Sequence, residues 1–252
     1  MSIRLFHCIF MLTLLVITGC ALGRSQQGGK NNPAAYHYQM GLSFLGERNF
    51  TAALVELTES EKLDPDNPEV IYNLGIAYMG KKRPDLAEQK FLRTLLLKPA
   101  FSSARNYLGV AYLELKRWDN AIQQFQIVKD DIFYENVEDA TINLGLSYLG
   151  KGEYPKALDE LRGVILANPR KVEARLSLGR VYFAMDKPEQ AIVEYRKALD
   201  IYKDYAGAYY HLGQAYLKLN NLDDAKAAFK EVIRIIPDSD LGRSSIKYLE
   251  LF

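Results

Sequence analysis

Residues 138–171 read EDATINLGLSYLGKGEYPKALDELRGVILANPRK. In this stretch Gly145 is followed three residues later by Tyr148. Ala157 stands twelve residues after the glycine, and Leu161 stands sixteen after it. The same order of glycine, aromatic, alanine and large apolar residue returns along the chain at intervals of 34 residues, with one interval of 36. Self-similarity at a fixed period indicates a repeat architecture. The glycines that mark the six repeats are Gly41, Gly75, Gly109, Gly145, Gly179 and Gly213.

Each repeat predicts a pair of helices, and no strand is predicted. The glycine lets the first helix approach the second without an intervening Cβ, the alanine does the same from the second helix, and the aromatic fills the space between the two. A proline then ends the second helix, because it lacks an N–H and disfavours helix in the residue before it. No unit buries its apolar face alone, so stacked repeats build one continuous core. The closing prolines are Pro65, Pro99, Pro169 and Pro237.

These positions resemble the tetratricopeptide repeat over residues 34–239. The resemblance implies an all-α, right-handed superhelical solenoid. A terminal helix over 240–252, with Ser239 or Asp240 as its N-cap, would cover the last apolar surface. The six repeats are expected at 34–67, 68–101, 102–137, 138–171, 172–205 and 206–239.

The N-terminus predicts a lipid anchor. Residues 1–19 form a signal peptide with a short apolar run, too short to span a membrane, which needs roughly 20 residues. The residues before Cys20 resemble a bacterial lipobox, which implies that this cysteine is acylated. Residues 20–33 are a polar tether that reaches on the order of 20 Å as a flexible coil. Because Ala21 rather than an aspartate follows the cysteine, we expect the protein at the periplasmic face of the outer membrane.

Charge and residue usage argue against several classes of function. The whole chain carries a formal charge of +1, with 32 Lys+Arg and 31 Asp+Glu, and loss of Arg4 with the signal peptide makes it neutral. A neutral chain has no excess of cations to bind nucleic acid. No cluster of residues has metal-ligand spacing, and no glycine-rich phosphate loop follows a strand. We therefore expect no cofactor, no metal, no small-molecule substrate and no catalysis.

A partner protein is expected on the first helices of the repeats. In tetratricopeptide arrays, positions three before, two before and one after the glycine line the inner face. In the first four repeats these positions are mostly apolar, with Asn73, Asn106 and Asn143 able to bond a peptide backbone, whereas in the last two repeats they turn polar. Such a surface suits an amphipathic helix or an extended apolar strand. The candidate groove residues are Tyr38, Leu42, Tyr72, Asn73, Ile76, Asn106, Val110, Ile142, Asn143 and Leu146.

The lengthened third repeat carries the segment Ile132-Phe133-Tyr134-Glu135 before the next repeat. With the lipobox, the short tether, six repeats and a terminal helix, the chain resembles the type IV pilus biogenesis lipoproteins called pilotins (the PilF/PilW family). That resemblance implies a scaffold that escorts outer-membrane secretin subunits until they insert and multimerise. The alternative is a general envelope adaptor lipoprotein that recruits peptidoglycan enzymes or other assembly factors.

Overall fold

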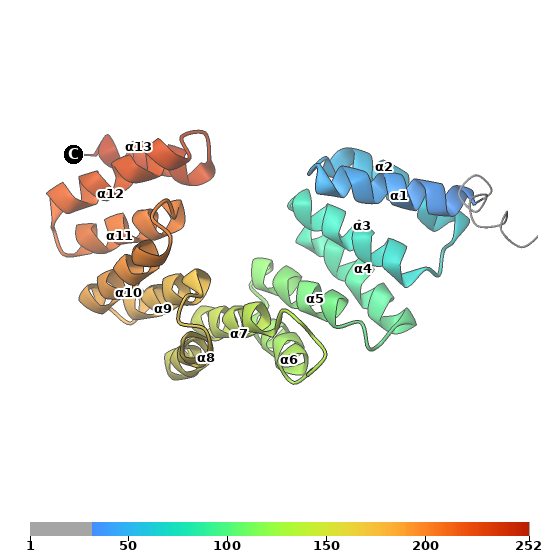
Figure 1. Ribbon diagram of the computed structural model, residues 1–252, viewed down its shortest axis with the longest axis horizontal. Coiled ribbons are helices and arrows are strands. Elements are labelled where there is room, and N and C mark those ends of the chain that lie inside the picture. Colours follow the sequence, from blue (N-terminus) through green and yellow to red (C-terminus); the bar gives the residue numbers. More distant parts are fainter. Residues whose placement is uncertain (1–31, 252) are drawn as a thin grey trace, which may run out of the picture.

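The protein is all-α in the residues that the computed structural model describes, 32–251. The expected signal peptide, Cys20, most of the tether and Phe252 lie outside this range. Consecutive helices pack as antiparallel pairs, two for each repeat, and a last helix follows the sixth pair (Figure 1). The helices are α1 Pro33–Gly46, α2 Phe50–Leu63, α3 Pro68–Gly80, α4 Pro84–Leu97, α5 Ser102–Glu114, α6 Trp118–Lys129, α7 Val137–Lys151, α8 Tyr154–Ala167, α9 Val172–Ala184, α10 Pro188–Ile201, α11 Ala206–Lys218, α12 Leu222–Ile235 and α13 Asp240–Leu249.

Local sequence explains where these helices begin and end. An asparagine or serine side chain caps several N-termini and accepts a backbone N–H of the first turn. Ser239 caps α13, where its Oγ accepts the Gly242 N–H at 2.9 Å. The four closing prolines each stand two residues beyond the last residue of a second helix. The residues that cap with a side chain are Asn32, Asn49, Asn67, Asn221 and Ser239.

The turn inside each repeat uses a left-handed residue seven positions after the repeat glycine. Only in the fourth repeat is this residue a glycine, Gly152, with a φ of 82°. The other five are larger residues held at φ between 55° and 60°. A left-handed residue at this place ends the first helix and turns the chain into the second. The five are Arg48, Lys82, Lys116, Asp186 and Asn220.

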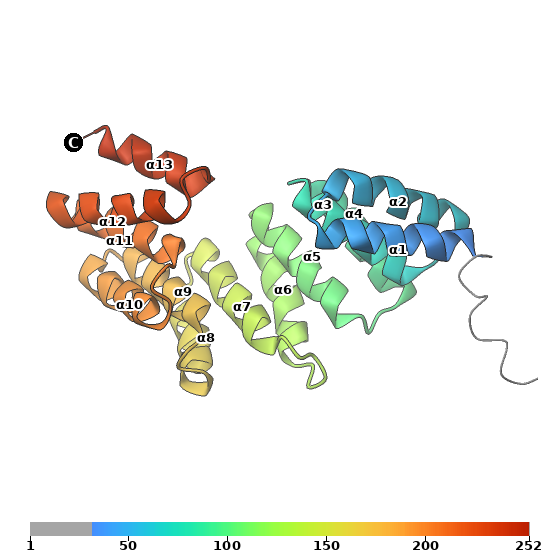
Figure 2. The ribbon, with the colours of Figure 1, turned by 45° about the horizontal axis from the view of Figure 1, so that its top comes forward.

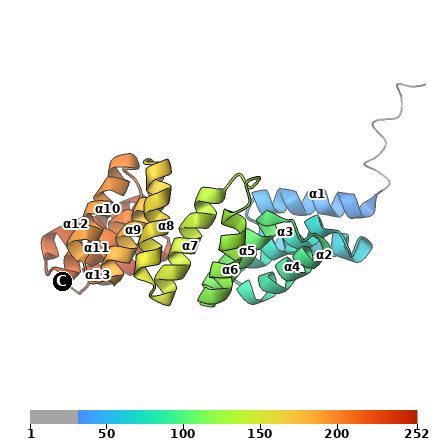
Figure 3. The same ribbon diagram turned by 90° about the horizontal axis from the view of Figure 1, so that it is seen from below.

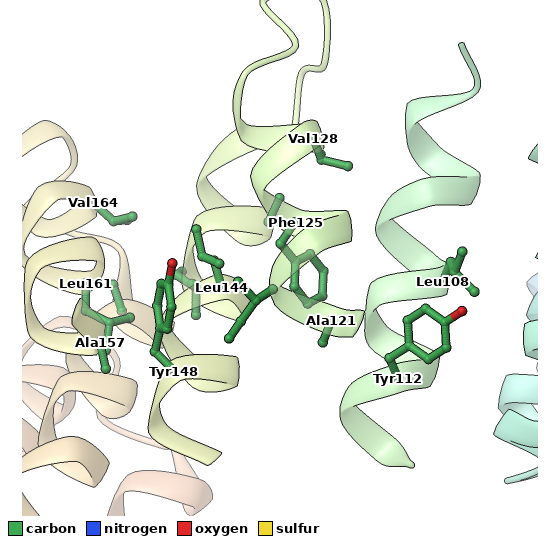
Figure 4. Close-up of a cluster of buried hydrophobic side chains, with 14 of the residues drawn as sticks. Leu108, Tyr112, Ala121, Phe125, Val128, Leu144, Tyr148, Ala157, Leu161 and Val164 are labelled. Carbon is green, nitrogen blue, oxygen red and sulfur yellow. The ribbon is translucent and has the colours of Figure 1, made fainter. Parts of the chain in front are cut away.

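The repeat glycines lie directly against the large apolar residue sixteen positions later. A Cβ added to Gly109 would sit 2.7 Å from two carbons of the Phe125 ring, and one added to Gly145 would sit 2.9 Å from Cγ of Leu161. Both partner side chains are fully buried (Figure 4). The alanine twelve positions after each glycine is fully buried in all six repeats. These contacts confirm that glycine and alanine let the two helices of a repeat pack closely.

The aromatic residue three positions after the repeat glycine makes contacts beyond its own repeat. It was predicted to fill the space inside its own repeat, but its hydroxyl also reaches the second helix of the preceding repeat. Gln126 of α6 donates to the Tyr148 hydroxyl at 3.0 Å, and Arg162 of α8 donates to the Tyr182 hydroxyl at 2.9 Å. Lys156 of α8 lies over the Tyr148 ring from the same repeat. The aromatic therefore joins neighbouring repeats as well as the two helices of one repeat.

The repeats follow one another along the long axis of the molecule and curve into an arch (Figures 1 and 3). The backbones of the first helices of successive repeats approach each other closely, whereas the second helices of neighbouring repeats meet through long side chains, as in the ion pairs of Lys90 with Glu61 at 2.7 Å and of Lys129 with Glu160 at 2.7 Å. Because the inner circumference of an arch is the shorter one, the first helices line the concave side. At the mouth of the arch, Lys82 lies 3.5 Å from Asp240 of α13, so the last helix approaches the second repeat.

The buried side chains form three clusters. The largest runs from Ala87 of α4 to Val181 of α9, and it includes the residues of Figure 4. A second cluster runs from Ala191 of α10 to Phe229 of α12 and is covered by Tyr248 of α13. The third is small and joins α2 to α3. The division between the first two clusters falls inside the fifth repeat.

The connection between α6 and α7 protrudes from the arch (Figure 2). Asp131 anchors it, because its carboxylate accepts the Ser102 hydroxyl and the Phe133 N–H. Tyr134 packs against the largest core cluster, and burial raises the pKa of its hydroxyl. Ile132 and Phe133 are 89% and 88% exposed. The connection is thus held at its base and carries two apolar side chains at its tip.

Candidate partner-binding groove

The ten predicted groove residues all lie on the inner helices α1, α3, α5 and α7. Eight of them are half-buried, as a contact surface requires. Asn106 and Ile142 are more deeply placed, with 8% and 5% of their surface exposed. The Asn106 side-chain oxygen is buried and has no hydrogen-bond partner within residues 32–251. This residue therefore contributes to the floor of the inner face and presents little of its amide to a ligand.

Aromatic side chains that contact one another line the N-terminal half of the inner face. Tyr72 lies 4.9 Å from Phe101 and 5.9 Å from Tyr107, centroid to centroid. Asn73 donates to the Tyr38 hydroxyl at 3.3 Å and to the Glu69 carbonyl at 2.8 Å. Both N–H groups of the Asn73 amide are thus engaged inside the chain, so the expected bond from this amide to a peptide carbonyl would have to replace one of them.

The inner face is hollowed between the fourth and fifth repeats, where a depression of about 500 Å³ lies. Three predicted residues, Ile142, Asn143 and Leu146, line it from α7. No hydrogen bond to the Asn143 side chain occurs within the described residues, which leaves its amide available to a ligand. The other lining residues are Asp139, Lys171, Glu173, Leu176, Ser177, Arg180 and Tyr205.

The charges around this depression are of two kinds. Lys171 is paired with Asp139 at 2.6 Å, and this hydrogen bond raises the lysine pKa. Glu173 and Arg180 have no ion-pair partner within 4 Å in the part of the chain that is described. They stand seven residues apart on α9, which places them about two helical turns, or roughly 10 Å, apart along one face. The hollow therefore offers one free anion and one free cation at different points along its length.

Sequence reasoning predicted three of the ten residues that line this depression, all of them on α7. Leu176 and Arg180 occupy the same register as the predicted residues, but the polar character of the last two repeats kept them out of the predicted site. Tyr205 lies in the connection before α11, outside the register of the inner helices, and burial raises the pKa of its hydroxyl. A search by register alone, regardless of polarity, would have included the first two and missed the third.

Two further properties bear on function. Within residues 32–251, no group of three or more His, Cys, Asp or Glu side chains is placed to hold a metal ion. The helices of the described part include none with the length and apolar content that a membrane crossing needs.

Comparison with known protein families matches the repeats on both sides of the depression. Models of the tetratricopeptide repeat match residues 38–103, 72–132 and 206–239, and a model described as TPR repeat matches 179–220. Together these ranges cover more than half of the chain.

One curated protein is similar to this chain in sequence, and two solved structures are similar to it in fold. The curated DnaJ homolog subfamily C member 3 from Bos taurus is 26% identical over 123 residues, and this chain spans about a quarter of its length. The crystal structure of PilW, a type IV pilus biogenesis factor, has a TM-score of 0.73 at 19% identity and covers 86% of this chain and 99% of its own. PilF of Pseudomonas aeruginosa has a TM-score of 0.64 at 18% identity and covers 86% of this chain and 97% of its own. With its glycine and alanine contacts, its paired helices and its family matches, this chain belongs to the tetratricopeptide repeat proteins.

Proposed function

We propose that this protein is a lipid-anchored scaffold of type IV pilus biogenesis, which holds secretin subunits at the outer membrane until they multimerise. The observation that carries this proposal is the end-to-end correspondence with PilW, which spans nearly the whole of both chains. A solenoid that corresponds over its full length presents an inner face of similar extent. The lipobox expected at Cys20 agrees with an anchored scaffold.

The anchor would place the inner face close to the membrane. As expected from its sequence, the tether between Cys20 and α1 would reach on the order of 20 Å. A captured subunit would therefore stay beside the bilayer that it must enter, which raises its local concentration there. Cys20→Ala should move the protein from the outer-membrane fraction to the soluble periplasm. Cys8→Ala, which changes a cysteine inside the signal peptide, is the matched control and should leave the distribution unchanged.

The inner face would bind the client. Ile76→Asp combined with Leu146→Asp places two carboxylates where an apolar partner must desolvate them. This double variant should reach the membrane and fail to recover secretin. Leu96→Asp combined with Leu166→Asp adds the same charge at residues that are 81% and 85% exposed, and should bind secretin normally. Circular dichroism of both variants separates loss of binding from loss of fold.

The decisive experiment is deletion of the gene. Secretin monomers should remain, whereas multimers in the outer membrane, surface pili and twitching should all decrease. If multimers and pili are normal in the deletion strain, the pilus role is refuted and the envelope-adaptor alternative takes its place.

A further inference from the structure

Two departures from the repeat pattern meet in the fifth repeat. The residue after the repeat glycine is aliphatic in the first four repeats, and in the fifth it is Arg180. The large residue that packs against the glycine is leucine or phenylalanine in five repeats, and in the fifth it is Tyr195. Neither polar group is needed for packing, because the first four repeats pack with an aliphatic residue after the glycine and the other five repeats pack with leucine or phenylalanine against it. The aliphatic residues at the position of Arg180 are Leu42, Ile76, Val110 and Leu146.

Tyr195 carries a polar atom into the inner wall. Its ring lies against Gly179 of α9 on one side and is stacked on His211 of α11 at 5.8 Å on the other. The side chain is fully buried, and its hydroxyl has no hydrogen-bond partner within residues 32–251. A buried hydroxyl without a partner costs on the order of 1–3 kcal/mol. The fifth repeat retains it where the second, third and sixth carry phenylalanine.

Arg180 stands beside these groups without a counter-charge. Its positive charge acts on Tyr195, Tyr205 and His211, so the guanidinium lies near all three. None of them neutralises it: burial raises the pKa of both tyrosines, and burial together with Arg180 lowers the pKa of His211 to about 4. At neutral pH these three neighbours of the guanidinium are uncharged, and the unpaired anion of the hollow, Glu173, stands about two helical turns away on α9. In this partly water-excluded place an anion is attracted to Arg180 more strongly than in open water.

We infer that the depression between the fourth and fifth repeats binds an extended segment of the partner in which one acidic side chain is flanked by aliphatic residues. The carboxylate contacts Arg180, whose guanidinium can donate two parallel N–H bonds to its oxygens. The flanking aliphatic residues lie on Ile142, Leu146 and Leu176, and Asn143 bonds the segment's backbone. This inference rests on the protein-binding role proposed above, and it specifies the chemistry of the segment that is bound.

We assign the carboxylate to an Asp or Glu side chain of the segment, and not to its C-terminus, because the inner face continues past Arg180 in both directions. Ile142 and Leu146 extend it toward the fourth repeat, and Tyr210 and Gln214 of α11 extend it toward α13. A segment that passes through can use the whole surface, whereas a chain end would use half of it.

The test starts from a phage-displayed library of random heptapeptides with no free C-terminus, selected on the full chain in detergent. Selected peptides should carry one Asp or Glu between aliphatic residues. Selection on Arg180→Leu, which installs the aliphatic residue of the earlier repeats, should keep the aliphatic preference and lose the acidic one. Selection on Lys230→Leu, which removes one positive charge from the exposed surface of α12, should give the same peptides as the unmodified protein.

One selected peptide is then made with a fluorescein label in two pairs of forms. In the first pair its Asp or Glu is kept or replaced by the matching Asn or Gln, and in the second pair its C-terminus is free or amidated. Fluorescence anisotropy should show that Arg180→Leu weakens the acidic peptide about tenfold or more, the effect of losing one charge-assisted hydrogen bond. The amide peptide should bind both proteins equally, and amidation of the C-terminus should change nothing. The inference is overturned if no peptide is enriched, if the acidic preference survives Arg180→Leu, if Lys230→Leu weakens binding as much, or if amidation abolishes it. None of these outcomes depends on secretin, so the pilus role stands or falls separately.

Discussion

Replacement of a glycine by alanine should change the stability of this protein in opposite directions at Gly109, which packs against Phe125, and at Gly163, which packs against nothing. In an exposed helix interior, Gly→Ala stabilises by about 0.8–1 kcal/mol, because alanine is the better helix former. Gly163 lies in α8 with nothing within 4 Å of an added Cβ, so Gly163→Ala should gain this amount. Gly109 lies in α5, where the added Cβ would be 2.7 Å from two ring carbons of Phe125.

At Gly109 the clash outweighs the helical gain. Carbon atoms pack at about 3.5–4.0 Å, so the Phe125 ring or the helix would have to move by roughly 1 Å. Overpacking of this kind costs about 1–3 kcal/mol, and we place this case in the upper part of the range because Phe125 is fully buried. After the helical gain is subtracted, Gly109→Ala should lose about 1–2 kcal/mol. Urea unfolding followed by circular dichroism measures both variants. A Gly109→Ala protein as stable as the unmodified one would refute the assigned contact.

Three further variants test other parts of the molecule. Ala121→Trp forces a ring into a fully buried position and should destabilise by at least about 1–3 kcal/mol, with urea titration as the measurement; an unchanged midpoint would contradict the register. His211 has a pKa of about 4 against 6.5 when unfolded, so only the unfolded chain gains a proton between these values. Stability should fall by up to about 3 kcal/mol as pH drops from 6.5 to 4, and His211→Gln should reduce this slope; equal slopes would exclude the histidine. Phe133→Ser should change stability by less than about 0.5 kcal/mol, whereas Tyr134→Ser should lower it clearly, and equal effects would contradict the placement of the connection.

The helical pairs were predictable because the positions that decide them are local and periodic. The glycine at the start of each pattern and the large residue sixteen positions on meet inside one repeat, as Gly145 and Leu161 do. The proline that ends α8 acts on the backbone beside it, so Pro169 is informative without knowledge of the rest of the chain. The start of the last helix was predictable for the same reason, because Ser239 caps α13 by accepting a hydrogen bond from the N–H of Gly242, only three residues away.

Other features could not be predicted because they depend on neighbours far along the sequence or on backbone geometry. The left-handed turn residue is a lysine at Lys82 and at Lys116, and lysine carries no signal for that conformation. The second contact of Tyr148 is with Gln126 in the preceding repeat, which the pattern of one repeat does not reveal. Of the predicted groove, Asn106 is largely buried, because helical register gives the direction of a side chain and not how closely the next helix covers it.

The division of the core inside the fifth repeat bears on cooperativity. Ala174 and Val181 of α9 belong to the large central cluster, whereas Ala191 of α10 belongs to the C-terminal one. Repeat arrays open in contiguous units, and a boundary between core clusters is where one unit ends and the next begins. The depression at Arg180 spans this boundary, since Ile142 of α7 belongs to the central cluster, whereas Leu176 of α9 packs against the C-terminal one. A segment bound there would couple the two units, because it binds only when both are folded. Amide hydrogen exchange in α12 and α13, which the segment does not touch, would then slow when the depression is filled.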